Sequence, residues 1–507
     1  MSFIDGLENE MNISITENGA RGFRTTGKAL LDFNFKIATY REKSVIDIQH
    51  DFTKVWNENK ELALKFLFYI RDIREGVGER RLFREAIKPI INELDTRVFD
   101  WIEEYGRLDD LFIFMNTGLE SAMVSWVKAK LTADMFAHKE GKPCSLMAKW
   151  MPSINTSSNE TRRLANIFVN AFGISKKEYR KMLSGLRGHI KVLEKQLCAN
   201  KWSEVDYEAV PSMANLKYKD AFKKHDKERR QAYLDALDRG EAKINSSVTF
   251  PHDIVNKYGM CNGWRSNLKN YDAALEAMWK SLPDYVQGNG NVLVVRDGSG
   301  SMTTSIGKTN ISALDVATAL AIYFSERAEG PYKDKFITFS SKPELIDLSK
   351  LNTLRAKLLE CYKYDDCSNT DIEATFDLVL RIAVKNNLRQ DQLPTLMMVS
   401  DMEFDDARGN YSRRWGYSSN SDDSKLFETI AKKYAKYGYK LPRLVFWNVH
   451  SSTGTIPVKE NENGVALVSG FSAAITKLVL SNETDPYKVL VNELMSKRYS
   501  QITLKTV

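Results

Sequence analysis

The spacing of apolar residues divides the chain near residue 285. From about residue 44 to 280, apolar side chains recur every three or four positions, which predicts amphipathic helices separated by short polar turns. Three of these predicted helices cover residues 60–73, 81–94 and 175–197. We expect an all-α domain here, either an irregular array of HEAT-like repeats or a compact helical bundle.

Two serines mark the beginnings of predicted helices in this half. Ser158 and Ser175 each precede a helical pattern, and Glu178 follows Ser175 by three residues. A serine and a glutamate at this spacing form a capping box, in which each side chain binds the backbone N–H of the other residue. The pattern therefore predicts helices that begin directly after Ser158 and Ser175.

After a Pro- and Gly-containing linker at residues 281–291, the pattern changes to short β-branched runs that alternate with helices. This alternation predicts a doubly wound α/β domain with a mainly parallel sheet. The predicted organisation is an N-terminal segment (1–43), a helical domain (44–285) and an α/β domain (286–507). The predicted strands cover 291–297, 335–341, 395–401 and 443–450, and the predicted helices between them cover 313–328, 371–386 and 426–438.

Oxygen-bearing side chains follow two of these predicted strands. Asp297, Ser299 and Ser301 form a D-x-S-x-S loop directly after the first strand, and Asp401 ends the strand at 395–401. Thr370 opens a predicted helix between them. Ligands of doubly wound sheets bind at the carboxyl ends of the strands, and carboxylate and hydroxyl oxygens suit Mg²⁺ or Mn²⁺. These five residues are therefore predicted metal ligands, direct or through water.

Their order along the chain resembles the metal-ion-dependent adhesion site of von Willebrand A domains. Two positions depart from that pattern: Arg296 precedes the aspartate, and Gly298 replaces a common valine. Arg296 is a candidate partner for the acidic residues Glu403, Asp405 and Asp406, and such pairing would alter the affinity for metal.

A helical array followed by such a domain resembles the Ro (TROVE plus von Willebrand A) ribonucleoproteins. The similarity is greatest to an uncharacterised Ro-like branch found in bacteria, phages and large viruses. It implies a helical ring joined by the A domain, with a basic surface that binds structured RNA and single-stranded 3′ ends. The stretches that carry it include TENGARGFRTTGKALLDFNFK (16–36), IRDIREGVGERRLFR (70–84), AKWMPSINTSSNETRRLA (148–165) and SDMEFDD (400–406).

Positive charge is concentrated in part of the helical half. The net charge of the chain is +7, and residues 151–200 alone hold nine Lys or Arg against three Asp or Glu. Binding to a polyanion requires such clustering, although a solvated helix face has the same composition. The predicted RNA contacts are Arg71, Arg74, Arg80, Arg81, Arg84, Arg162, Arg163, Lys176, Lys177, Arg180, Lys181, Arg187 and Lys191.

Aromatic residues lie among or beside these basic stretches. As core residues they would pack inside the helices, and as exposed residues they would stack on unpaired bases. For each one taken singly, the core is the preferred interpretation. They are Tyr179, Trp202, Tyr207, Tyr218 and Phe222.

Other function classes find less support in the sequence. The five cysteines lack a C-x-x-C pair and the six histidines lack an H-x-x-x-H pair, so neither a disulfide scaffold nor a zinc site is predicted. No apolar run reaches the ~20 residues of a membrane span, and the N-terminus is unlike a secretory signal. We therefore expect a soluble cytoplasmic protein (in the host cytoplasm or a particle, if viral), most simply a monomer.

The predicted function is an RNA-binding ribonucleoprotein scaffold that resembles Ro and is not an enzyme. The A domain would close the ring, or bind a protein ligand that donates a carboxylate to the metal. The alternative is a metal-dependent protein-interaction or assembly module, such as a component of a viral or bacterial particle, without RNA. A metal-dependent nuclease is a third hypothesis, for which the sequence shows no accompanying general base or nucleophile.

Overall fold

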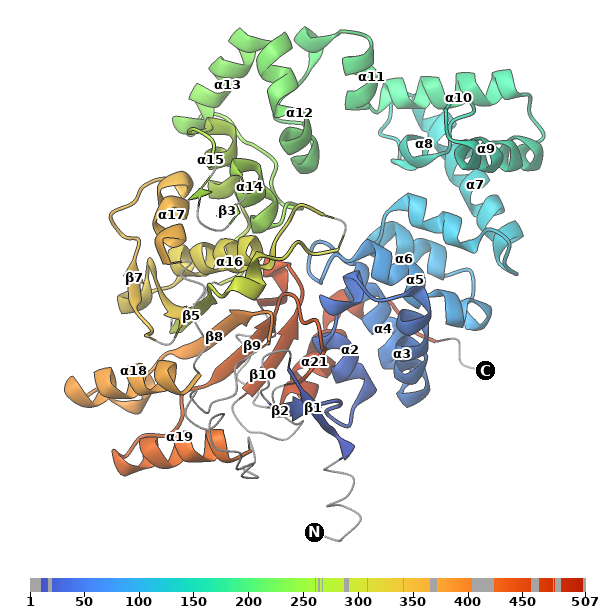
Figure 1. The fold of residues 1–507 in the computed structure, drawn as a ribbon. Coiled ribbons are helices and arrows are strands. Elements are labelled where there is room, and N and C mark those ends of the chain that lie inside the picture. Colours follow the sequence, from blue (N-terminus) through green and yellow to red (C-terminus); the bar gives the residue numbers. More distant parts are fainter. Residues whose placement is uncertain are drawn as a thin grey trace.

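The protein, described here by a computed structural model, has a helical region followed by an α/β domain with a six-stranded sheet (Figure 1). The predicted fold class is confirmed. The structure describes residues 11–16, 21–259, 261–262, 265–266, 268–286, 291–307, 309–340, 342–364, 372–403, 424–456, 465–476, 478 and 485–504.

The sheet is parallel except at one edge. Its strand order is β10-β9-β8-β5-β6-β7, and among these described strands only β7 runs antiparallel to its neighbour. The first strand, β5, is central, with β6 on one side and β8 on the other, so the strand order reverses between β5 and β8. The strands are β5 (Val292–Asp297), β6 (Lys335–Phe339), β7 (Leu345–Asp347), β8 (Thr395–Ser400), β9 (Leu444–Asn448) and β10 (Val465–Ser469).

Both faces of the sheet are buried, which explains why its strands read as continuous apolar runs. Along β5, Val292 and Val294 belong to the large core shared with the helical region, whereas Leu293 and Val295 belong to a second core on the opposite face. Successive strand residues point to opposite faces, so one short run of β-branched and aliphatic side chains serves both cores.

Helices cover the two faces of the sheet. The first face packs against α16 (Ala313–Arg327), which lies between the sheet and α14 (Pro251–Tyr258). The other face packs against α18 (Ile372–Lys385) and α19 (Ser424–Lys436). Ser312 caps α16 and forms a capping box with Asp315.

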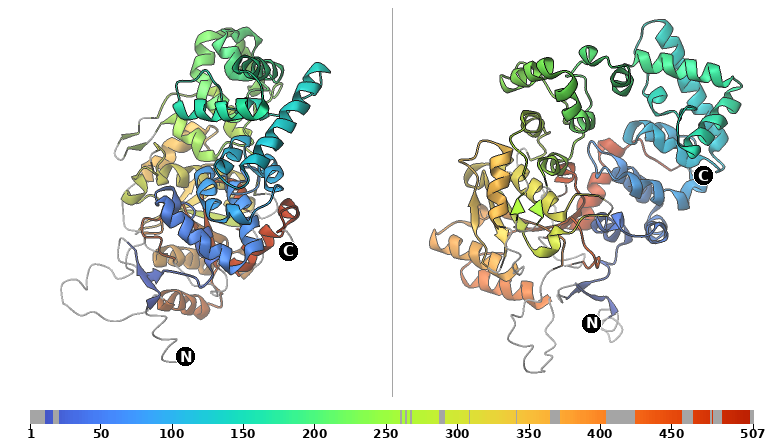
Figure 2. Two further views of the ribbon diagram at one scale, coloured as in Figure 1. Left: turned by 90° about the vertical axis from the view of Figure 1, so that its right-hand side faces the viewer. Right: turned by 45° about the horizontal axis from the view of Figure 1, so that its top comes forward.

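The helices of the N-terminal half follow an arc whose two ends both pack against the α/β domain (Figures 1 and 2). In chain order the helices of the arc are α3 (Val45–Glu58), α4 (Lys60–Arg71), α5 (Arg80–Ala86), α6 (Val98–Tyr105), α7 (Glu120–Lys139), α8 (Met147–Trp150), α9 (Asn159–Phe172), α10 (Lys176–His189), α11 (Leu193–Cys198), α12 (Ser212–His225), α13 (Lys227–Asp238), α14 and α15 (Ala273–Lys280). At one end, α3 and α4 pack against α2 (Ala29–Phe35) and α21 (Pro486–Leu494), which contact the sheet edge at β10. At the other end, α14 contacts α16, and α15 contacts α17 (Leu354–Cys361).

Two predicted helices are interrupted. The predicted helix at 81–94 is α5 followed by a 3-10 segment, Lys88–Glu93, because Pro89 lacks the N–H that continued α-helix would need. The predicted helix at 175–197 ends at His189, and Lys191 adopts a φ of 48° before α11 begins. The predicted caps are confirmed: Ser158 accepts from the N–H of Thr161, and Ser175 and Glu178 form a capping box.

The N-terminal segment packs on the α/β domain, although the two lie far apart in the sequence. Its helix α2 (Ala29–Phe35) places Leu31 and Phe35 in the second core. The Nδ2 of Asn448 donates to the carbonyl of Phe35 at 2.9 Å, and the N–H of Ala38 donates to Ser469 at 3.0 Å.

The C-terminal segment returns to the first helices of the arc. The Nζ of Lys65 on α4 donates to the carbonyls of Tyr499 and Ile502 at 3.0 and 2.7 Å. Arg498 pairs with Asp72 at 2.8 Å and with Glu104 at 2.6 Å. Contacts between residues about 400 positions apart therefore hold the start of the arc against the α/β domain.

Candidate functional site

The two predicted metal-binding aspartates lie at the carboxyl ends of neighbouring strands. Asp297 is the last residue of β5, and Asp401 directly follows the end of β8. The strands pair in parallel with Arg296 beside Val399, which brings the two carboxylates to the same edge of the sheet. This edge is the point where the strand order reverses, the usual ligand position in open α/β sheets.

A continuous set of hydrogen bonds joins the aspartates through two serines. Asp297 accepts from the N–H of Ser299 at 2.9 Å, and the hydroxyls of Ser299 and Ser301 lie 3.0 Å apart. The hydroxyl of Ser301 in turn hydrogen-bonds to Asp401. The structure thus brings together four of the five predicted ligands, while Thr370 lies outside the described residues.

Both carboxylates are buried, and burial raises their pKa. Asp297 is fully buried, and Asp401 is 3% exposed. Burial, followed by the nearby charge of Asp297, raises the pKa of Asp401 to about 7. For Asp297 the pKa is raised by burial, against hydrogen bonds from Ser400 and Ser299. Two negative charges so close in a dry site are costly unless a cation or a proton compensates them.

Two residues that the sequence did not single out shape this site. The hydroxyl of Ser400 donates to Asp297 at 2.6 Å and accepts from the N–H of Met402 at 3.0 Å. Met402 has a φ of 63°, a conformation that costs energy for a side chain of this kind. The sequence feature that could have identified Ser400 is its position in the run TLMMVSD, directly before the strand-terminal aspartate.

The next residue, Glu403, is held by a loop of the following strand. Its carboxylate accepts from the hydroxyls of Ser451 and Ser452 at 3.0 and 3.1 Å and from the N–H of Thr453 at 3.0 Å. Glu403 is 3% exposed. This buried set of bonds connects the loop of Asp401 to the residues after β9.

These donors fit a small divalent cation. Carboxylate and hydroxyl oxygens are the hard ligands that Mg²⁺ and Mn²⁺ prefer, and a cation would neutralise the two buried carboxylates. Within the part of the chain that the structure describes, no group of three or more His, Cys, Asp or Glu side chains could hold a metal ion. A cation at this place would therefore need the serine hydroxyls to complete its coordination.

Arg296 lies on the opposite face of β5 from the second core. Its Nε donates to Thr318 of α16 at 3.2 Å, one guanidinium NH donates to the carbonyl of Cys361 at 3.4 Å, and the side chain is buried. Its positive charge lowers the pKa of Asp297. Of its three expected acidic partners, Asp405 and Asp406 lie outside the described residues.

The loop after the D-x-S-x-S motif rests on the helical region. The N–H of Gly307 donates to Glu42 at 2.8 Å, and Asn256 of α14 donates to the carbonyl of Asn310 at 2.7 Å. The D-x-S-x-S loop therefore lies at the junction of the arc and the α/β domain.

The predicted RNA contacts fall into two groups in the structure. In α10, Lys176, Lys177, Arg180 and Lys181 are all exposed and share one face, while Tyr179, Leu183 and Leu186 bury the other. No ion pair or hydrogen bond engages these four cations within the described chain. Lys191, beyond the helix end, is exposed as well.

Most of the other predicted contacts bind groups within the protein. Their partners are carboxylates in some cases and backbone carbonyls in others. Arg71 pairs with Asp110, Arg84 with Asp109 and Asp110, Arg163 with Glu160, Arg162 with Asn159, Arg74 with the carbonyl of Glu104, Arg81 with the carbonyls of Tyr40 and Lys43, and Arg187 with the carbonyls of Ala148 and Met151. Arg80 is exposed.

The aromatic residues near the basic stretches are mostly core residues, as expected. Tyr179 and Phe222 are fully buried and Tyr207 is 5% exposed. Trp202 is partly exposed, and its ring stacks on His225 with centroids 4.4 Å apart.

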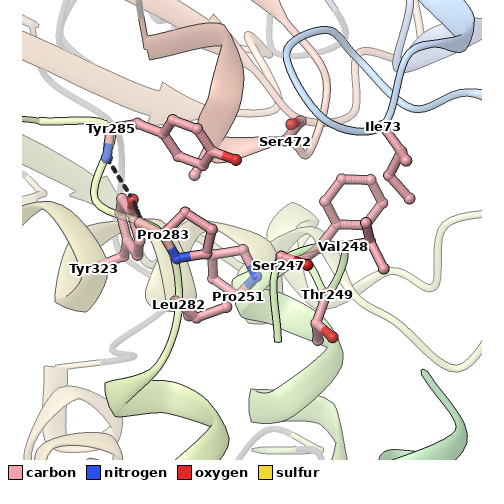
Figure 3. Close-up of a pocket in the computed structure, with 12 residues that line it drawn as sticks. Ile73, Ser247, Val248, Thr249, Pro251, Leu282, Pro283, Tyr285, Tyr323 and Ser472 are labelled. Atoms are coloured by element: carbon pink, nitrogen blue, oxygen red, sulfur yellow. Dashed lines mark hydrogen bonds between the residues drawn. The ribbon is translucent and has the colours of Figure 1, made fainter. Parts of the chain in front are cut away.

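A small pocket lies where the two halves meet, between the segment before α14, the linker after α15 and the loop after β10 (Figure 3). The N–H of Tyr285 donates to the hydroxyl of Tyr323 across one side, at 3.1 Å. Its lining side chains are apolar or hydroxyl-bearing, without a carboxylate, an amine or an imidazole to perform acid–base chemistry.

Among the described helices, none has the length and apolar character to cross a bilayer.

Comparison with known proteins places the two halves in separate domain models. Residues 291–501 match a domain of unknown function (DUF7788), and residues 16–92 and 169–292 match another (DUF2828). An uncharacterized protein of Acanthamoeba polyphaga mimivirus, L728, is 28% identical over 528 residues, which cover 95% of this chain and 87% of the relative.

Among solved structures, the Ro (RSR) protein of Deinococcus radiodurans matches over 95% of both chains, with 14% identity and a TM-score of 0.37. The predicted similarity to a protein of a large virus is confirmed. At this level of similarity no residue role passes from Ro to this chain.

Proposed function

We propose that the protein is an RNA-binding scaffold in which the helical arc binds RNA and the α/β domain holds a divalent cation. The carrying observation is the face of α10, where Lys176, Lys177, Arg180 and Lys181 are exposed together, with no partner among the described residues. Four adjacent unpaired cations attract a polyanion because neutralisation of each phosphate releases counterions.

Asp297, Ser299, Ser301 and Asp401, with Thr370, are proposed to hold Mg²⁺ or Mn²⁺. The support is the hydrogen-bonded set of oxygens at the strand ends and the burial of both carboxylates. The cation would supply positive charge for an acidic group of a protein ligand, or of a phosphate, to complete its coordination.

Fluorescence anisotropy with a hairpin RNA that carries a single-stranded 3′ tail tests the RNA proposal, in 50 to 200 mM salt. We expect the affinity of the wild type to fall at least about 10-fold over this range. Substitution of Lys176, Lys177, Arg180 and Lys181 by Gln should weaken binding and reduce the salt slope by about 0.7 for each phosphate that the variant no longer neutralises. The RNA is recovered intact from titrations with Mn²⁺ if the protein is a binder and not a nuclease.

The matched control carries the same change in charge on exposed lysines elsewhere: Lys280, Lys350, Lys385 and Lys440 to Gln. Its salt slope should stay that of the wild type. Equal reductions in affinity in both variants would show that only net charge matters and would contradict a site on α10. Weak binding by the wild type at low salt would contradict the RNA function altogether.

A second candidate function, a metal-dependent assembly module without RNA, is favoured by the buried pair Asp297 and Asp401. It predicts homo-oligomers in Mg²⁺ that dissociate in EDTA and do not form in Asp297→Ala. Light scattering on nucleic-acid-free protein distinguishes it, since the RNA scaffold should keep one mass in both buffers.

A further inference from the structure

A cluster of four arginines surrounds two aspartates between α5 and the segment after α6. Asp110 is fully buried and accepts from the Nε of Arg71 at 2.8 Å and from the Nε of Arg84 at 2.6 Å. Asp109 accepts from Arg107 at 2.5 Å and pairs with Arg84 at 3.0 Å. The fourth arginine, Arg80, begins α5, one helical turn before Arg84.

The cluster holds two more positive than negative charges. Asp109 and Asp110 are the carboxylates that pair with Arg71, Arg84 and Arg107. In the described chain no carboxylate comes within ion-pair distance of Arg80. Partial burial of the Arg80 side chain lowers its pKa, and the charges of Arg107 and Arg84 lower it further. Arginine stays protonated despite such repulsion, so the excess charge persists and attracts an anion.

The cluster is open to solvent on one side and fixed on the other. Arg71 and Asp110 are buried, whereas the side chains of Arg84 and Arg107 are 30% and 32% exposed. The guanidinium of Arg107 lies over the ring of Trp150, 4.0 Å from its centroid, which is a cation–π geometry. The buried carboxylate of Asp110, the partly exposed carboxylate of Asp109 and the ring of Trp150 thus hold the guanidinium groups of Arg84 and Arg107 in place before any ligand binds.

We propose that Arg80, Arg84 and Arg107 form a subsite for one phosphate of the RNA backbone, with Trp150 as a residue that positions Arg107. The inference rests on the proposed RNA-binding function and adds a second contact surface to the face of α10. Guanidinium groups match the oxygens of a phosphodiester through paired hydrogen bonds, and their preorganisation reduces the entropy lost on binding.

The test combines protein variants with RNA in which single phosphates are replaced by neutral methylphosphonates. In the wild type, at least one such replacement should weaken binding about 3- to 10-fold. Arg80→Gln should weaken binding by a similar factor, reduce the salt slope by about 0.7, and abolish the effect of that replacement. Arg80→Lys keeps the charge but not the paired hydrogen bonds, so it should keep the wild-type salt slope and recover only part of the affinity.

Arg239→Gln is the matched control, because Arg239 is an exposed arginine of the same half that pairs with Glu241. It should bind like the wild type at every methylphosphonate position. If Arg80→Gln also behaves like the wild type while the α10 variant binds RNA more weakly, the subsite is wrong and the RNA function stands. If the wild type does not bind RNA, both proposals fail together.

Discussion

Among single residues, His252 is the titratable group whose burial has the clearest consequence for stability. It is 2% exposed, lies between the rings of Phe250 and Phe471, and has its pKa lowered to about 3 by burial and then by the charge of Arg41. The folded protein therefore requires neutral His252. The stability that it contributes is complete above the unfolded pKa of about 6.5 and is lost as the pH falls toward 3.

We expect the unfolding free energy of the wild type, relative to His252→Phe, to fall by about 1.4 kcal/mol per pH unit between pH 6 and 4. The comparison with the variant matters because burial raises the pKa of Asp253 to about 6, which gives the opposite pH dependence in the same window. Urea denaturation of both proteins at several pH values measures the difference. A difference that is constant with pH would show that His252 titrates normally.

The paired aspartates of the metal-type site predict an effect of metal on stability. Asp401→Asn removes one of two buried charges and should raise the melting temperature in EDTA. In 10 mM Mg²⁺ a site with a Kd of about 1 mM would stabilise the wild type by about 1.4 kcal/mol. This gain corresponds to about 3 °C for an α/β domain of about 220 residues that unfolds as its own unit, and the variant should lack it.

Differential scanning fluorimetry with and without Mg²⁺ measures both effects. Asp391→Asn is the control, since Asp391 is an exposed carboxylate that pairs with Arg389 on the same domain. It should keep the wild-type response to Mg²⁺. An equal Mg²⁺ gain in Asp401→Asn would remove Asp401 from the proposed ligands.

At the scale of elements, α11, α12 and α13 have a small core of their own. Leu193, Val205, Tyr207, Val210 and Phe222 form a cluster separate from the two large cores. The guanidinium of Arg230 is buried against the rings of Tyr207 and Phe222. A unit with few apolar contacts to the rest of the molecule can open on its own.

Phe222→Ala should therefore cost about 3–5 kcal/mol locally, because it leaves a cavity in this small core. Hydrogen exchange measured by mass spectrometry should show faster exchange in residues 193–238, with protection in the sheet unchanged. Phe446→Ala, a substitution in the second core, should instead increase exchange in the sheet. Uniform loss of protection in both variants would show that the arc and the sheet unfold as one unit.

At the scale of the whole molecule, the C-terminal segment of the chain packs against α4, at the start of the arc. Lys65 is 3% exposed and donates to two carbonyls of this segment. Loss of hydrogen bonds from a buried charged donor is costly, so Lys65→Met should destabilise the protein by about 2–4 kcal/mol and expose the segment to proteases.

Lys60→Met on the same helix provides the comparison. Lys60 is half exposed and pairs with Glu93, so its loss should cost less than about 1 kcal/mol. Chemical denaturation and limited proteolysis of the two variants measure the difference. Equal stability of the two would mean that Lys65 does not hold the C-terminal segment.

Local pattern was sufficient for the helical half, for four strands and three helices of the α/β domain, and for the caps at Ser158 and Ser175. It was also sufficient to place Asp297 and Asp401 at strand ends, because adjacent carboxyl ends follow from a parallel sheet. It did not predict β7, β10, α17 or α21 (Pro486–Leu494). The breaks after Ala86 and His189 were missed, since helical periodicity outweighed Pro89 and gave no sign of the left-handed Lys191.

Tertiary contacts alone decided which charges are free. Arg71 lies in the same basic stretch as Arg80, yet it is buried against Asp110, 39 positions away, while Arg80 stays unpaired in the described chain. Lys65 likewise finds its partners more than 430 positions along the chain. Composition counts charges, but pairing depends on which segments the fold brings together. The division of basic residues into structural and available ones is therefore a property of the folded molecule.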